Sequence, residues 1–114
     1  MMTIEPQNID KVCELCKNEI NICLSQKGYR LTKTENHPEA FGSKYWVWTN
    51  QELKHCFRFI WEGKDQLLVL EDSPYLNDPQ KTAWADLTIV PFDPSNDKLE
   101  YWNYIKKSIT EEIR

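Results

Sequence analysis

The sequence predicts an α+β protein, a two-layer sandwich in which an N-terminal and a C-terminal helix pack on one antiparallel sheet of four to five strands. Apolar residues recur with a helical period near both ends of the chain and alternate in the middle. Turn-forming residues separate the alternating segments at short intervals, which favours a meander of hairpins. At 114 residues, a single domain over 1–114 is expected.

The first helix is predicted over residues 6–27. Pro6 is acceptable in a first helical turn, and Gly28 supplies a C-terminal stop. Seven apolar side chains fall within one sector of the helix of about 120°. They are Ile9, Val12, Cys13, Cys16, Ile20, Cys23 and Leu24. This stripe predicts a helix with one buried face.

Five segments with the composition of strands follow, at 29–35, 44–50, 53–61, 66–72 and 83–92. The Gly63-Lys64 pair predicts a two-residue hairpin turn with a positive φ at Gly63. That turn sets a register between the third and fourth strands. It pairs Trp61 with Gln66, Phe59 with Leu68 and Phe57 with Leu70.

In this register the two strands have one strongly apolar face, which is expected to carry the helices. It comprises Phe57, Phe59, Trp61, Leu68 and Leu70. The other face is also fairly apolar and comprises Cys56, Arg58, Ile60, Leu67 and Val69. The register of the second strand on the third is open, and a one-residue change moves Trp46 and Trp48 from one face to the other.

The chain is expected to end in a helix that runs to about Ile113. The segment 73–82 has two prolines and polar residues and is predicted to be a loop. Asp93, Ser95 and Asn96 are candidate N-caps of the last helix. Its predicted apolar stripe comprises Leu99, Trp102, Ile105, Ile109 and Ile113.

Composition and charge exclude several classes of function. The net charge is −4, and the acidic residues are concentrated in the second half. Nucleic-acid binding is disfavoured, because the chain lacks the clustered Lys or Arg that phosphate contacts need. No apolar run approaches the roughly 18 residues of a membrane span, and the first residues lack the pattern of a secretion signal. A cytoplasmic protein with reduced cysteines is therefore expected.

The segment KVCELCKNEINIC holds three of the four cysteines, the first two as Cys-x-x-Cys. A redox pair of this kind follows a strand and begins a helix, whereas Cys13 and Cys16 lie inside a predicted helix. A zinc site would need two further ligands, from Cys23, Cys56 or a histidine. Because reduced cysteine is among the most buried residue types, a structural role is predicted, with neither metal nor cofactor.

No catalytic set is recognisable. His55 is expected on the apolar face of its strand, where a hydrogen-bonded structural role is typical. Glu71 and Asp72 are adjacent in a strand and point to opposite faces, so they cannot work as a paired acid and base. The chain is therefore predicted not to be an enzyme. The alternative is a small-molecule-binding or enzymatic domain with a pocket near His55.

Large aromatic side chains exceed the obvious need of two thin layers. They are Tyr45, Trp46, Trp48, Trp61, Trp84, Tyr101, Trp102 and Tyr104. Trp and Tyr are enriched at protein interfaces, and an apolar sheet face left bare by the helices usually meets a partner. A homodimer through this face is a competing use of the same surface.

The predicted partner-binding residues combine aromatic anchors with charged groups. The anchors are Trp46, Trp48 and Trp84, the charge partners are Asp72, Asp78 and Asp86, and Arg58 adds polar specificity. An acidic, aromatic surface of this kind suits the occlusion of a basic site on another protein.

The runs AFGSKYWVWTN, FRFIWEGKDQLLVL and AWADLTIV, within about residues 40–90, resemble small bacterial proteins of uncharacterised or toxin-immunity type. In those proteins a Phe-Gly-Ser turn precedes two strands, a charged Gly turn joins the next hairpin, and a Trp-x-Asp-Leu segment follows. The resemblance implies a toxin or effector as the partner and assigns no functional residue. A non-catalytic inhibitor or immunity-type protein is thus the leading prediction. A phage-type inhibitor of a host defence enzyme would use the same surface.

Overall fold

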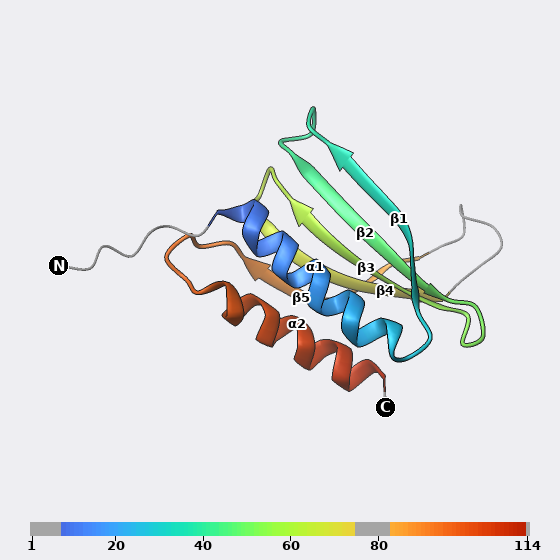
Figure 1. The fold of residues 1–114 in the computed structure, drawn as a ribbon. Helices are drawn as coiled ribbons and strands as arrows, with labels where there is room; N and C mark the ends of the chain where they lie inside the picture. Colours follow the sequence, from blue (N-terminus) through green and yellow to red (C-terminus); the bar gives the residue numbers. More distant parts are fainter. Residues whose placement is uncertain (1–7, 75–82, 114) are drawn as a thin grey trace.

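The computed structural model describes residues 8–74 and 83–113. The elements in chain order are α1 (Ile9–Ser25), β1 (Arg30–His37), β2 (Ser43–Asn50), β3 (His55–Glu62), β4 (Leu67–Pro74), β5 (Ala85–Pro91) and α2 (Lys98–Glu112). The strands form one antiparallel sheet in the order β1-β2-β3-β4-β5. Both helices lie on the same face of this sheet (Figure 1), so the predicted two-layer α+β fold is confirmed. None of the helices in the described part of the chain is long and apolar enough to cross a membrane.

Helix α1 begins at Ile9 because the Asn8 side chain accepts a hydrogen bond from the Asp10 amide. The predicted stripe is confirmed, with its flanking members Ile9 and Cys23 only partly buried. Its fully buried members are Val12, Cys13, Cys16, Ile20 and Leu24. After the helix ends, Gly28 takes a φ of +87° and the Tyr29 amide bonds the Leu24 carbonyl.

The two cysteines of the Cys-x-x-Cys pair face the sheet. Burial raises the pKa of both the Cys13 and Cys16 thiols to about 12. All four cysteines are free thiols. A buried thiol that stays protonated packs as a small apolar group, as the sequence predicted.

The predicted turn between β3 and β4 is wrong. The loop holds four residues rather than two, and Gln66 carries the positive φ in place of Gly63. The register is therefore shifted by two residues, so that Trp61 pairs with Leu68 and Phe57 with Asp72. Because a shift of two preserves the faces, the predicted apolar face is nevertheless correct. Glycine is needed at 63 for another reason, since a Cβ there would overlap the Phe41 backbone in the β1–β2 turn.

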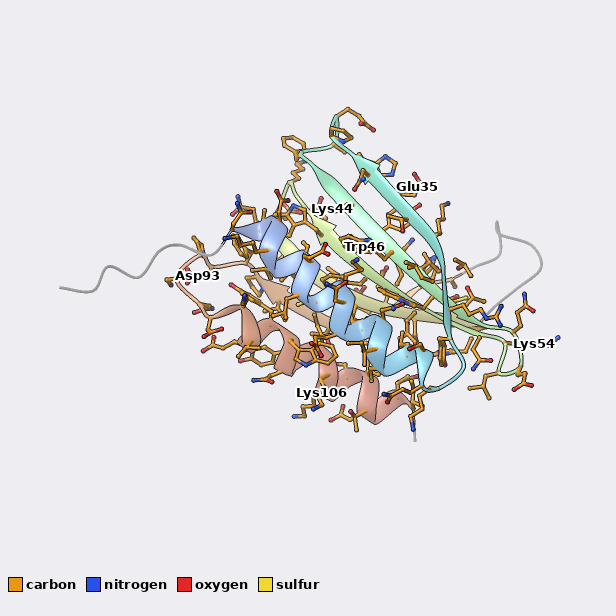
Figure 2. The ribbon with its side chains drawn as sticks, viewed as in Figure 1. Glu35, Lys44, Trp46, Lys54, Asp93 and Lys106 are labelled. Atoms are coloured by element: carbon orange, nitrogen blue, oxygen red, sulfur yellow. The ribbon has the colours of Figure 1, made fainter. Side chains whose placement is uncertain are left out.

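The register of β2 on β3 places the tryptophans of β2 on the helix side. Trp46 pairs with Phe59 and Trp48 with Phe57. Trp48 is 0% exposed and its indole N–H donates to Asn21 of α1 at 3.1 Å. The ring of Trp46 stacks on Phe59, and Figure 2 shows Trp46 on the sheet beneath α1. These side chains form the centre of the core.

Helix α2 differs from the prediction in two details. Its N-cap is Asp97, whose side chain accepts from the Leu99 amide. Tyr101 is buried, whereas Leu99 is 52% exposed. The tyrosine can be buried because its hydroxyl donates to the Asp93 carbonyl. Ile105 and Ile109 continue the buried stripe as predicted.

The predicted loop 73–82 is only partly within the described residues. Ser73 and Pro74 belong to β4 and pair with Cys56 and His55 of β3. The rest of the predicted loop, 75–82, lies outside the described residues, and so does the Asp78 of the predicted binding set.

Candidate functional site

The sheet face opposite the helices carries a row of alternating cationic and aromatic side chains. Among the described residues, no helix lies on this face, here called the open face (Figure 1). The row runs from Lys33 of β1 through Tyr45 of β2 and Arg58 of β3 to Trp84, just before β5. These four residues are called the cation–aromatic row. It extends across most of the width of the sheet.

Arg58 is the centre of the row. Its guanidinium carbon lies 4.2 Å from the centroid of the Trp84 ring and 5.6 Å from that of Tyr45. Arg58 Nε and Nη2 both reach Glu71 Oε1 on β4, at 2.7 and 2.6 Å. Charge-assisted hydrogen bonds and two ring faces therefore hold the guanidinium in one position.

Burial makes the ionised form of the Glu71 carboxylate less favourable. Burial raises its pKa, the Arg58 guanidinium opposes that rise, and the neighbouring Asp86 carboxylate adds to it. Burial and the Asp86 carboxylate together outweigh the Arg58 guanidinium, so the pKa of Glu71 is raised overall. The contacts with Glu71 fix the position of Arg58, and a partly buried ion pair of this kind is weak evidence for added stability.

An irregularity in β5 brings acidic and apolar side chains onto the open face together. The pairing with β4 shifts between Leu70 and Glu71, so Asp86 is opposite Glu71 and Ile89 is opposite Val69. Asp86 is exposed and Ile89 is 52% exposed. Regular alternation would have put residues 86 and 89 on opposite faces. The bulge gives this face both a carboxylate and an apolar contact.

The structure brings three predicted binding residues together and separates the others. Arg58, Trp84 and Asp86 lie on the open face. The prediction that Trp46 and Trp48 are anchors is wrong. They are 7% and 0% exposed on the helix side and cannot contact a partner of the folded chain. Asp72 also lies on the helix side, at the end of β4, so it too is removed from the predicted surface. The structure adds two residues to the row. Tyr45 had been counted among the excess aromatic side chains, whereas Lys33 had no signal beyond its strand position.

A second group of polar side chains lies at the end of the sheet where both helices end. His55 accepts or donates at both ring nitrogens, with Tyr29 Oη 2.7 Å from Nδ1 and Asp72 Oδ2 2.8 Å from Nε2. Burial raises the pKa of the Tyr29 phenol to about 12, so the hydroxyl keeps its proton. In the neutral imidazole, Tyr29 therefore donates to Nδ1 and Nε2–H donates to Asp72.

Glu112, the last residue of α2, joins this group. Its pKa is raised, first by a hydrogen bond to the Asp72 carboxyl and then by partial burial, while His55 lowers it. An open pocket of about 420 Å³ is lined by Tyr29, His55, Asp72 and Glu112, with the rest of its wall from Leu53, Lys54, Pro74 and Ile113. The pocket near His55 was an alternative from the sequence, but Tyr29 and Glu112 come from distant segments and had no sequence signal.

No model of a protein family matches the chain, and the comparisons with curated proteins and with solved structures give no match either. The likeness of residues 40–90 to toxin-immunity-type proteins therefore stays a prediction. Function is inferred from the geometry of the two sites.

Proposed function

We propose that the protein is a non-catalytic binding module whose open face docks a protein partner, in the manner of an inhibitor or immunity protein that blocks a toxin or effector. The observation that carries the proposal is the fixed position of Arg58 between Trp84 and Tyr45. Trp, Tyr and Arg are the residues most enriched among those that dominate binding energy at interfaces.

The fixed guanidinium favours binding because less side-chain freedom is lost when a partner docks. Ile89 and Ile60 supply apolar contact area next to the row. Asp86 gives the β5 end of the open face an exposed carboxylate, and the whole chain carries a net charge of −4. A basic partner surface is therefore the complementary one, and attraction at long range would speed its association.

The partner is first isolated from the host by its retention on the wild-type chain, and it is then purified. Its affinity is measured by calorimetry for the wild type and for the Trp84→Ala, Asp86→Ala double variant. We expect the double variant to bind at least about 100-fold more weakly, since loss of one central aromatic anchor alone costs 2 kcal/mol or more. Inhibition of the partner's activity should weaken in parallel.

The matched control is Tyr104→Ala on α2, which removes an aromatic ring that is 59% exposed on the helix side. This variant should bind the partner as the wild type does. Equal weakening by the control and by the open-face variant would rule the proposal out, as would wild-type affinity in the open-face variant. A concentration-dependent dimer that Trp84→Ala dissociates would assign the same face to a homodimer instead.

A second candidate function is favoured by the pocket beside His55. It is a small-molecule-binding or enzymatic role, in which the ligand contacts Tyr29, His55 and Asp72. Converging polar groups in a preformed pocket are typical of ligand sites. A His55→Gln variant that keeps partner affinity but loses the binding of a small molecule that co-purifies with the chain would support this role.

A further inference from the structure

Three side chains with metal-ligand chemistry meet at the end of the sheet, each from a different element. His55 begins β3, Asp72 is near the end of β4, and Glu112 ends α2. One ligand atom from each lies within 4.8 Å of the others. We propose that these three residues form a binding site for one divalent first-row transition metal ion, with Zn²⁺ or Co²⁺ as probe. The proposal is independent of the open face.

The distances fit a shared ion after a small side-chain movement. Ligand atoms about 2.1 Å from a tetrahedral zinc lie about 3.4 Å apart. His55 Nε2 and Asp72 Oδ2 are already 2.8 Å apart, so an ion would take the place of the proton between them. Glu112 is exposed and its side chain is free to rotate by the remaining distance.

Tyr29 is arranged as a positioning residue for the imidazole. Metal-bound histidines use their second ring nitrogen for a hydrogen bond that fixes the ring. The Tyr29 hydroxyl, 2.7 Å from Nδ1, fills that place. When an ion occupies Nε2, the imidazole proton moves to Nδ1 and the hydroxyl becomes the acceptor. The His55 ring also packs nearly perpendicular to the rings of Tyr29 and Phe57.

The charges around the site favour a cation. With a neutral imidazole, the two carboxylates give the ligand set a charge of about −2 when both are ionised. The two helices run in the same direction, so their C-terminal ends lie at this end of the sheet (Figure 1). Neither helix has a basic residue in its last turn. The negative ends of both helix dipoles are thus left without a cation from those turns.

One further feature of the pocket bears on the proposal. Lys54, at the tip of the β2–β3 turn in Figure 2, also lines the pocket and is the one nearby cation among its lining residues. It is exposed and can turn away when an ion binds.

The site would be a three-ligand site with its remaining positions open to the pocket and to water. It would supply one imidazole nitrogen and two carboxylate oxygens, which are ligands that Zn²⁺ and Mn²⁺ accept. Because its ligands come from the sheet and from α2, a bound ion would fasten the C-terminal end of α2 to β3 and β4. Metal binding should therefore raise the melting temperature.

The test uses the full chain without an affinity tag, titrated with Co²⁺ under reducing conditions and followed by visible absorption and by thermal melting. We expect one ion per chain, no thiolate-to-cobalt band, and a rise in melting temperature. His55→Gln and Glu112→Gln should each weaken the affinity by about tenfold or more, and Tyr29→Phe by about tenfold. Binding of Zn²⁺ is measured by competition.

Matched controls separate this site from general binding. Glu111→Gln changes the adjacent exposed glutamate, and His37→Gln changes the second histidine of the chain. Both should bind Co²⁺ as the wild type does. The proposal is overturned if the folded wild type binds no Co²⁺ at sub-millimolar concentration, or if either control weakens binding as much as Glu112→Gln. Partner binding by the open face is unaffected by either outcome.

Discussion

Removing the Glu71 carboxylate tests how firmly the open face holds Arg58. In Glu71→Leu the guanidinium loses both of its hydrogen bonds to Oε1, at a site where the two side chains are only 23% and 11% exposed. Breaking a fully buried pair costs about 3–5 kcal/mol, and an exposed pair contributes about 0–1 kcal/mol. Partial burial places the expected loss at about 2 kcal/mol. Arg58→Met should cost a similar amount, because it leaves the carboxylate unpaired.

The Glu71→Leu, Arg58→Met double variant should have a free energy of unfolding within about 1 kcal/mol of the wild type's, since it removes both desolvation costs together with the attraction. The coupling energy from the four proteins is then about 3 kcal/mol or more. Urea unfolding followed by circular dichroism measures it. If the two single losses simply add, with a coupling below about 0.5 kcal/mol, solvent screens the pair and Arg58 is not held in place.

The pH dependence of the same pair has a defined sign. Because the pKa of Glu71 is raised above its ordinary value of 4.5, the folded state binds more protons than the unfolded state. The stability of the wild type relative to Glu71→Gln is therefore greatest below about pH 4.5. It should fall as the pH rises through the folded pKa. A relative stability that increases over this range would contradict the assigned cause.

Three other predictions concern the core and the contact between two turns. Trp48→Ala should lose about 3–5 kcal/mol in urea unfolding and Tyr104→Ala less than about 0.5 kcal/mol; equal losses would place Trp48 outside the core. Burial raises the pKa of Cys13 and Cys16 from 9.0 to about 12. A thiol reagent at pH 8 should therefore label them about a thousandfold more slowly in the folded chain than in the unfolded chain. Fast labelling in the folded state would contradict this. Gly63→Ala should cost about 1–3 kcal/mol because its methyl overlaps the β1–β2 turn, and an unchanged urea midpoint would refute that contact.

The fold followed from the sequence where periodicity alone decides the structure. The stripe of α1 and the apolar face of β3 and β4 were predicted because burial selects residues at fixed intervals. The β3–β4 register was not, because Gly63 fits a two-residue turn as well as it fits close backbone contact with Phe41. Tyr101 replaced Leu99 in the core because its hydroxyl found the Asp93 carbonyl, a partner that no helical pattern reveals.

The candidate site was predicted only in part. Arg58 and Trp84 were expected on one surface, but their contact depends on the order of strands across the sheet. Asp86 and Ile89 share that surface through a bulge that the alternation of β5 does not indicate. The partners of His55 lie beyond local patterns too, since Tyr29 is 26 residues away in the sequence. Such positions are set by tertiary packing.

The central claim is that a protein partner covers the open face. It is tested most directly by hydroxyl-radical footprinting of the purified complex against the free chain, read by mass spectrometry at single aromatic residues. We predict that Trp84 and Tyr45 lose reactivity in the complex, while Tyr104, 59% exposed on α2, keeps its own. Protection of Tyr104 with unchanged oxidation of Trp84 and Tyr45 would contradict the claim.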